Sequence, residues 1–229
     1  CVAFWEKTKV SELSSVHGRP GLLITFEGPE GSGKSTLISS LAERLTACGP
    51  APLVTREPGG TRVGERIRDV LLDPDLPEQT RETELLLMVA SRAQLVRQII
   101  LPALDEGRIV ICDRYADASV AYQGGGRELG AEVVDELNQF AVGDAVPDLT
   151  FLCLLPPALG RARMGDRDRD RLELEDAAFH ERVYDAYRGM AESNVRRFRL
   201  IDASTTPDIM LEQTLENLRI VEHDLLTGL

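Results

Sequence analysis

The sequence predicts an α/β fold in which a parallel sheet is covered by helices on both faces. Short apolar runs alternate with longer stretches of helical periodicity along the 229 residues. The runs carry few polar residues, which is typical of strands buried on both faces. Neither an internal repeat nor a low-complexity linker divides the chain, and its length suits one sizeable core. We therefore expect a single domain.

The expected elements alternate in chain order. Helices are expected where apolar residues recur three or four positions apart, and strands where short runs are apolar throughout. The expected strands are 22–27, 53–55, 108–112, 149–155 and 198–201. The expected helices are 34–47, 62–72, 83–104, 131–142, 175–194 and 207–226. Because a parallel strand pair needs a long crossover connection, this alternation favours a parallel sheet.

The first twenty residues differ in composition from the rest of the chain. They contain the only tryptophan, Trp5, and two of the three lysines. We expect residues 1–20 to be an N-terminal extension without a part in the function. Residues 21–229 are expected to form the single domain.

The composition excludes several classes of protein. The formal net charge is −12, so the spread basic surface of a nucleic-acid binder is not expected. No apolar run approaches the roughly 18 to 20 residues of a membrane span, and no signal peptide is expected. The four cysteines are widely separated without metal-ligand spacing, so neither a zinc site nor a disulfide framework is indicated. We expect a soluble cytoplasmic protein, with no membrane contact, whose anionic ligand is small.

A glycine-rich loop follows the first expected strand. Residues 28–36 read Gly-Pro-Glu-Gly-Ser-Gly-Lys-Ser-Thr and fit the Walker A pattern. The glycines let backbone N–H groups surround phosphate oxygens, and the dipole of the next helix adds positive charge. Lys34 is expected to reach the β and γ phosphates of ATP, and the Ser35 hydroxyl to bind Mg²⁺. The expected ATP-binding residues are Gly28, Glu30, Gly31, Ser32, Gly33, Lys34, Ser35 and Thr36.

Lys34 is the only lysine beyond residue 20, where every other basic residue is arginine. This usage indicates a need for a compact ammonium group at that position. A glycine turn with a surface lysine is the alternative, and the position between strand and helix disfavours it. Because the Asp-x-x-Gly and Asn-Lys-x-Asp motifs of GTP-binding switches are absent from the sequence, phosphoryl transfer to a small acceptor is favoured.

A second polar segment follows the expected strand 108–112. Asp113 and Arg114 stand at its carboxyl end, where open parallel sheets place the ligand crevice. An aspartate there can position Mg²⁺ through water, and an arginine can hold a second phosphate. Taken alone, these residues also fit a salt bridge at the end of a strand.

Three segments together resemble the bacterial thymidylate kinases. They are the Walker A loop with its acidic Glu30, the loop 55–61 (Thr-Arg-Glu-Pro-Gly-Gly-Thr), and the segment 113–127 (Asp-Arg-Tyr-Ala-Asp-Ala-Ser-Val-Ala-Tyr-Gln-Gly-Gly-Gly-Arg). The resemblance extends from about residue 22 to the C-terminal helix. It implies a P-loop kinase fold with a parallel five-stranded sheet, transfer of the γ phosphate of ATP to dTMP to give dTDP, and a homodimer.

The resemblance also implies the residues around the sugar and phosphate of dTMP. Carried over by position, Glu30 faces the sugar and Arg114 holds the acceptor phosphate. Glu57 and Pro58 form the wall near that phosphate. Tyr122 crowds the 2′ position and so favours deoxyribose.

The residues that the resemblance implies for base contacts match the family at all but one position. Ser119 and Gln123 fall where the family contacts the base edge, and Arg92 where an arginine reaches the base carbonyl. The family usually has a phenylalanine at the position of Met88, one helical turn before that arginine. A methionine can cover a pyrimidine face but gives up aromatic stacking, and it also fits a plain core residue. Another nucleoside monophosphate is therefore an alternative acceptor.

An arginine-rich stretch at 161–173 is expected to form a lid over ATP. Asp and Arg alternate from 166 to 171, so an extended chain would place Arg167, Arg169 and Arg171 on one side. The tetrapeptide 170–173 matches the Asp-Arg-x-Glu signature of the family lid. A solvated surface run is the alternative interpretation.

The expected chemistry is direct phosphoryl transfer without a covalent intermediate. The expected metal ligands are Ser35 and Asp113, and a non-catalytic nucleotide-binding module is the alternative of a different class. The expected catalytic residues are Lys34, Arg114, Arg171, Arg167 and Arg169.

Overall fold

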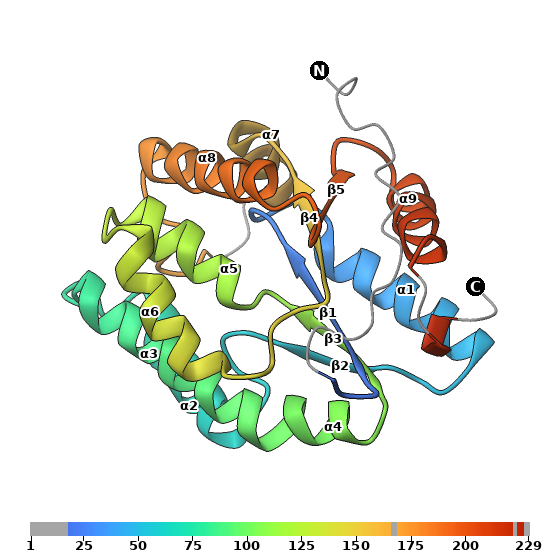
Figure 1. The fold of residues 1–229 in the computed structure, drawn as a ribbon. Coiled ribbons are helices and arrows are strands. Elements are labelled where there is room, and N and C mark those ends of the chain that lie inside the picture. The colour runs from blue at the N-terminus through green and yellow to red at the C-terminus, as the bar shows by residue number, and fades with distance from the viewer. Residues whose placement is uncertain (1–17, 166–168, 222–223, 227–229) are drawn as a thin grey trace.

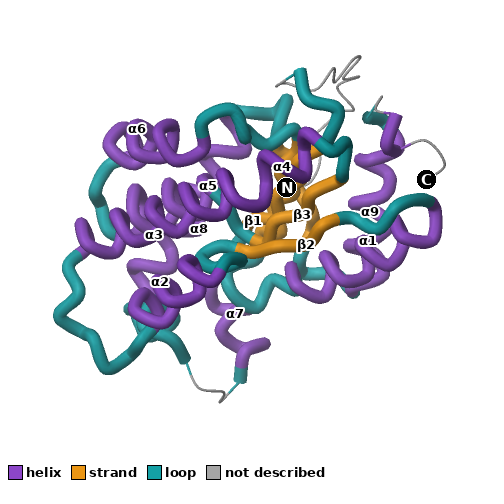
Figure 2. Tube along the Cα trace, turned by 90° about the horizontal axis from the view of Figure 1, so that it is seen from below, coloured by secondary structure: helices purple, strands orange, loops and turns teal. Residues whose placement is uncertain are grey.

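The computed structural model describes residues 18–165, 169–221 and 224–226. Almost all of the expected N-terminal extension lies outside these residues. The described chain forms one parallel sheet with helices on both faces, as expected (Figures 1 and 2).

The sheet has five strands in the order β2-β3-β1-β4-β5, and every neighbouring pair is parallel. The first strand is central, with Leu22 opposite Ile109 on one side and Ile24 opposite Leu149 on the other. The strands are β1 (Leu22–Glu27), β2 (Leu53–Arg56), β3 (Ile109–Asp113), β4 (Leu149–Leu154) and β5 (Phe198–Asp202).

The helices lie close to the positions expected from periodicity. They are α1 (Lys34–Cys48), α2 (Arg62–Leu72), α3 (Arg81–Leu95), α4 (Leu101–Asp105), α5 (Ala116–Ser119), α6 (Ala131–Val142), α7 (Pro157–Met164), α8 (Ala177–Ser193) and α9 (Pro207–Arg219). Four of them begin at a residue whose side chain accepts a hydrogen bond from the first turn, which satisfies an otherwise unpaired N–H group. These N-caps are Thr61, Thr80, Asp176 and Thr206.

Alternate residues of β1 enter two different hydrophobic clusters. Ile24 and Phe26 pack in a cluster with α1 and α9, whereas Leu23 packs in a cluster with the end of α3 and with α4. Figure 2 shows α1 and α9 together on one side of the sheet. Because successive side chains point to opposite faces, a central strand covered on both sides is apolar at most positions, and its two buried polar residues, Thr25 and Glu27, are hydrogen-bonded. This explains the continuous apolar run in the sequence.

Three segments differ from the expectation. Residues 116–126, to which no helix or strand was assigned from the sequence, form α5 and the π-helical segment Val120–Gly126. Helix α7 was also not expected, and the closing helix ends at Arg219 instead of residue 226. All three are short or end without a glycine or proline signal, so periodicity marks them poorly.

The stretch Arg81–Asp105 is long and apolar enough, by length and composition, to span a membrane. It comprises α3, the π-helical segment Val96–Ile100 and α4. In the structure it packs against α2 and α6 and buries Glu84 and Arg92. These contacts are those of a core helix, so the stretch is weak evidence for a membrane segment.

Helix α7 packs directly against the Walker A loop through two glycines. A Cβ on Gly160 would lie 2.5 Å from the carbonyl oxygen of Glu30, and one on Gly31 would lie 2.4 Å from the carbonyl oxygen of Gly160. Both distances are too short for real atoms, so only glycine allows the two backbones to approach this closely. The start of the arginine-rich segment is thereby joined to the phosphate loop.

Gly160→Ala is expected to lower the free energy of unfolding by about 1 to 3 kcal/mol, because the new methyl group must push α7 and the loop apart. The matched control is Gly189→Ala in α8, where a Cβ would meet nothing within 4 Å. The control should raise the free energy of unfolding by roughly 0.5 to 1 kcal/mol, because alanine favours the helix. Urea unfolding measures both, and equal effects would contradict the close approach of the two glycines.

Candidate active site

The Walker A loop lies at the carboxyl end of β1 and leads into α1. Gly28, Gly31 and Gly33 have φ angles of 130°, 71° and 84°, which other residues rarely adopt. A Cβ on Gly28 would also lie 2.2 Å from the carbonyl oxygen of Cys153 in β4. The glycines therefore serve both the turn and the close approach to the sheet.

The ammonium group of Lys34 is held inside the loop. Its Nζ donates to the carbonyl oxygens of Gly28 and Pro29, both at 2.8 Å, and to Ser32 Oγ at 3.3 Å. Burial and the charge of Arg114 lower its pKa from 10.5 to about 8. The group is therefore positioned before any ligand arrives, and an anion beside it would favour the charged form.

Ser35 and Asp113 meet at the expected metal position. Ser35 Oγ donates to Asp113 Oδ2 at 2.9 Å, across 78 residues of sequence. No group of three or more His, Cys, Asp or Glu residues with metal-binding geometry occurs in the described part of the chain. Mg²⁺ bound with nucleotide phosphates usually takes only one or two protein ligands, so this hydroxyl and carboxylate fit it.

Arg114 has a backbone φ of 66°, which is uncommon outside glycine and marks a constrained position. Its Nη1 donates to the carbonyl oxygen of Gly28 at 2.9 Å, and its Nη2 donates to Glu30 Oε1 at 2.7 Å. Tyr122 donates to the same carboxylate oxygen at 2.6 Å. Burial would raise the pKa of Glu30, but Arg114 and Lys34 outweigh it and the pKa falls below 4.5.

Lys34 and Arg114 line the same cleft. This phosphate cleft is formed by residues 30–36 together with Asp113, Arg114 and side chains from neighbouring loops. Lys34 was expected to contact the donor phosphates and Arg114 the acceptor phosphate, which requires both to border one space. The structure places Lys34, after the β1 loop, and Arg114, after β3, on the same cleft. Arg114 also borders a second pocket.

A second pocket adjoins this cleft and contains every residue implied for dTMP binding. Its lining includes Glu30, Glu57, Pro58, Met88, Arg92, Arg114, Ser119, Tyr122 and Gln123. We call it the acceptor pocket. These residues come from the β1 loop, the β2 loop, α3 and the segment after β3. The structure brings them together, while their contacts with a nucleotide stay a prediction.

Arg92 is 1% exposed and holds the floor of the acceptor pocket. It donates to Glu57 Oε2 at 2.8 Å, to Ser119 Oγ at 3.1 Å and to the carbonyl oxygen of Tyr115 at 3.1 Å, and it also donates to Asn138. Burial raises the pKa of Glu57 to about 7, against the opposing charge of Arg92. The guanidinium is therefore fixed by four protein partners.

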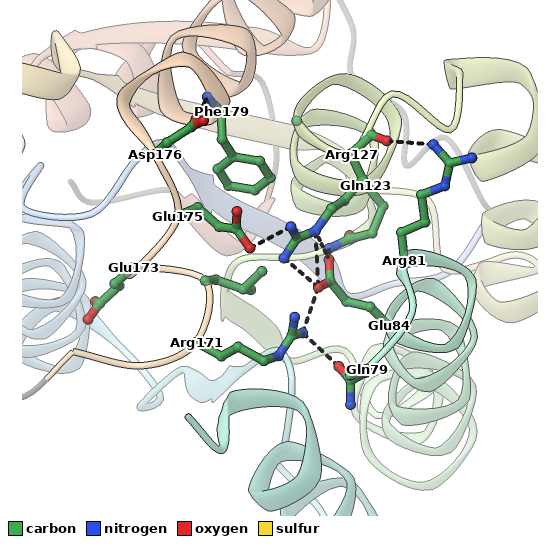
Figure 3. Close-up of polar contacts among 12 residues, drawn as sticks. Gln79, Arg81, Glu84, Gln123, Arg127, Arg171, Glu173, Glu175, Asp176 and Phe179 are labelled. Carbon is green, nitrogen blue, oxygen red and sulfur yellow. Dashed lines mark hydrogen bonds and ion pairs between the residues drawn. The ribbon is translucent and has the colours of Figure 1, made fainter. Parts of the chain in front are cut away.

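The arginines of the expected lid lie in different places. Arg167 lies outside the described residues. Arg169 is described and is partly buried. Arg171 is 8% exposed and donates to Glu84 and Gln79 (Figure 3). It also donates to the backbone of Leu71, and it does not line the phosphate cleft.

Of the stretch with alternating charge, the structure describes residues 169–171, and Arg171 among them lies in a turn. Residues 171–174 form turns, with Leu174 N donating to the carbonyl oxygen of Asp170 at 3.1 Å. The Asp170 carboxylate also accepts from the backbone of Leu172 and Glu173. These local bonds compete with an extended chain, which alternation of charge alone does not reveal.

Several residues of the phosphate cleft were not predicted. Arg56, Arg68, Asp170 and Glu173 line it. Arg56 stands inside the loop that carries the family resemblance, so its position was a usable signal. Arg68 lies half-buried on α2, outside every motif of the sequence, so the sequence holds no signal for it.

Glu27 supports Arg114 from behind, at the end of β1. Its Oε1 accepts from the backbone N–H of Tyr115 at 2.7 Å, and its Oε2 accepts from Tyr187 Oη–H at 2.8 Å. Tyr187 Oη in turn accepts from Arg114 Nη1 at 3.3 Å. Burial, and then the charge of Asp117, raise the pKa of Glu27 to about 8.

Glu27→Gln is expected to flatten the pH dependence of stability. The folded pKa of Glu27 is raised from 4.5 to about 8, so its contribution is complete below pH 4.5 and is lost as the pH rises through 8. In that window it lowers the free energy of unfolding by up to about 1.4 kcal/mol per pH unit. Urea unfolding between pH 5 and 8.5 should show a smaller slope for the variant, and identical slopes would refute the raised pKa.

Comparisons with known proteins agree with this geometry. Residues 26–213 match the thymidylate kinase family model. A thymidylate kinase of an Exiguobacterium species is 48% identical over 204 residues, covering 87% of this chain and 96% of that protein. The thymidylate kinase of Deinococcus radiodurans is 49% identical over 193 residues, covering 84% and 93%. The crystal structure of thymidylate kinase from Ehrlichia chaffeensis superposes with a TM-score of 0.73 at 32% identity, covering 87% and 98%. With this family match, the two cations on one cleft and the pocket beside it, the chain belongs to the thymidylate kinases, a family of ATP-dependent phosphotransferases.

Proposed function

We propose that this chain transfers the γ-phosphoryl group of ATP to dTMP, giving ADP and dTDP. One observation carries the proposal: Lys34 and Arg114 border one cleft and donate to the same carbonyl oxygen of Gly28. A donor phosphate and an acceptor phosphate can therefore meet there, with the acceptor's base in the adjoining pocket.

The donor side of the cleft is the Walker A loop. Backbone N–H groups of residues 30–36 and the N-terminus of α1 surround the phosphates, and Lys34 balances charge on the transferred group. Ser35 and Asp113 would hold Mg²⁺, and the ion would supply positive charge to offset that of the phosphate groups. The position of Ser35 Oγ, 2.9 Å from Asp113, supports this assignment.

The acceptor side is arranged around Arg114. Its guanidinium would hold the phosphate of dTMP in line with the donor, while Glu30 and Tyr122 fix the guanidinium and face the sugar. Catalysis is then positioning and charge stabilisation in a closed cleft, without a covalent intermediate. The hydrogen bonds of Arg114 to Gly28 and Glu30 support this role, because they leave its position fixed before binding.

The base is proposed to lie between Met88 and the polar edge formed by Arg92, Ser119 and Gln123. Met88 is half-buried and covers the pocket without an aromatic ring. Arg92 would reach a base carbonyl from its fixed position. Among acceptors, dTMP is favoured because the relatives bear the name thymidylate kinase, and nothing in the comparisons favours another monophosphate.

Arg167, Arg169 and Arg171 remain the proposed lid arginines. The arginine-rich segment starts in α7, which contacts the Walker A loop, so the start of the segment lies next to the proposed donor site. For Arg171 the role requires a second position of its side chain, because its donors are occupied by Glu84 and Gln79 in this structure.

A homodimer is proposed through α3 and α6, which pack against one another. Large apolar side chains are exposed on these two helices: Leu86 is 56% exposed, Val133 52% and Phe140 79%. A partner covering them would bury apolar area that is otherwise in contact with water. The proposed compartment is the cytoplasm, where ATP is supplied.

An acceptor panel tests the proposed reaction. With ATP and Mg²⁺, ADP release is expected to be fastest with dTMP and slower with dUMP, dCMP and dGMP, because the pocket carries fixed polar groups along one edge. A coupled assay measures the rates. Equal rates for all acceptors would contradict selection of thymine, and ATP binding without acceptor-dependent ADP release would support the non-catalytic alternative.

Arg114→Lys is expected to lower kcat/KM for dTMP by roughly 100-fold or more, because an ammonium cannot replace the planar fork that holds a phosphate. The KM for ATP should change far less, since Lys34 remains. Arg188→Lys on the exposed surface of α8 is the matched control and should behave as wild type. Similar steady-state constants for the two variants would remove Arg114 from the site.

A further inference from the structure

A buried polar cluster lies beside the acceptor pocket and is centred on Glu84, which is fully buried on α3 (Figure 3). We call it the Glu84 cluster. Arg127 and Arg171 supply its positive charge, from the segment after β3 and from the Asp-Arg-x-Glu turn. Its members are Gln79, Glu84, Gln123, Arg127, Arg171 and Glu175.

The two carboxylate oxygens of Glu84 have different partners. Oε2 accepts from Arg171 Nη2 at 2.6 Å, from Arg127 Nη2 at 2.9 Å and from Arg127 Nε at 3.2 Å. Oε1 accepts from Gln123 Nε2 at 2.8 Å and shares Arg127 Nε at 3.2 Å. Burial would raise the pKa of Glu84, but these donors lower it below 4.5. Glu84 is therefore a carboxylate, which only accepts hydrogen bonds.

This arrangement fixes the orientation of the Gln123 amide. Only the nitrogen of an amide can donate to a carboxylate, so Nε2 must face Glu84 and Oε1 must face away. The Gln123 side chain is fully buried and lines the acceptor pocket. Its Oε1 has no hydrogen-bond partner within the described part of the chain. A buried acceptor without a partner costs free energy that a ligand donor would recover.

We propose that Glu84 is a positioning residue that selects the acceptor base by turning the Gln123 carbonyl toward the base edge. Thymine and uracil carry an N–H donor at ring position 3, whereas cytosine has an acceptor lone pair there. A fixed carbonyl oxygen pairs with the first two and opposes the third. This inference rests on the proposed base position. It assigns base selection to Glu84, which acts through Gln123 and does not touch the base.

The cluster predicts what Glu84→Gln would do. The new carbonyl oxygen is expected at the Oε2 position, because guanidinium donors converge there. The new NH₂ group then faces Gln123, whose Nε2 cannot accept, so the Gln123 amide must turn over. The pocket would offer a donor in place of an acceptor.

The test is the ratio of kcat/KM for dTMP to kcat/KM for dCMP in the full chain. Glu84→Gln is expected to lower this ratio by about tenfold or more, through a higher KM for dTMP and a lower KM for dCMP, with kcat little changed. A purely structural role would lower both rates together. The control Glu175→Gln removes a carboxylate from Arg127 without touching Gln123, and it should keep the wild-type ratio even where it lowers stability.

Gln123→Leu separates failure of this inference from failure of the proposed site. If Gln123→Leu leaves the ratio unchanged, Gln123 does not face the base and the proposed base position fails. If Gln123→Leu lowers the ratio while Glu84→Gln keeps it at the wild-type value, the positioning role of Glu84 is overturned.

A double variant covers the case in which Glu84→Gln does not fold. Glu84→Gln with Gln123→Glu keeps the net charge of the cluster and returns an oxygen acceptor to the pocket side. This pair is expected to keep the preference for dTMP, whether or not the single variant folds. Loss of that preference in a folded double variant, judged by circular dichroism, would overturn the inference.

Discussion

The geometry of the active site depends on one backbone atom, the carbonyl oxygen of Gly28. Lys34 Nζ donates to it at 2.8 Å and Arg114 Nη1 at 2.9 Å, so two cations from separate strands converge on one point. The charge of Arg114 helps burial to lower the pKa of Lys34, and Asp113 and Glu30 offset part of this effect. Two cations therefore stand side by side in the phosphate cleft, although the chain as a whole has a net charge of −12.

The sheet holds this atom in place. Gly28 follows the central strand, whose neighbours β3 and β4 are hydrogen-bonded on both sides. Gly28 lies so close to β4 that a Cβ on it would be 2.2 Å from the carbonyl oxygen of Cys153. Arg114 is supported in the same manner from β3, with Glu27 binding both the next backbone N–H and the Tyr187 hydroxyl that contacts the guanidinium. Buried strands thus fix both cations with little freedom to adjust.

The sequence predicted the parts of this site that lie at strand ends and in local motifs. β1, the Walker A loop and the segment from Asp113 carry their signals in consecutive residues, and the structure places them together. Arg171 was assigned from the match of 170–173 to the Asp-Arg-x-Glu signature of the family, but its burial against Glu84 depends on a contact 87 residues away that no local pattern encodes. The π-helical segment with Tyr122 and Gln123 was missed because its glycines weaken helical periodicity, while packing of α8 against it sustains the helix.

The contact between Arg171 and Glu84 connects the arginine-rich segment to Gln123, the residue proposed to recognise the base. The Asp-Arg-x-Glu turn lines both spaces: Asp170 borders the phosphate cleft and the acceptor pocket, while Leu172 borders the pocket. Moving Arg171 toward ATP would take a guanidinium from Glu84 and leave Arg127 as its remaining cation. The Glu84 carboxylate, which accepts from Gln123, would then have one cationic partner fewer. Because Glu84 is buried, losing that partner would cost more free energy than it would at the surface. Under the proposed roles, a lid movement of Arg171 and recognition of the base would therefore be energetically coupled through the Glu84 carboxylate.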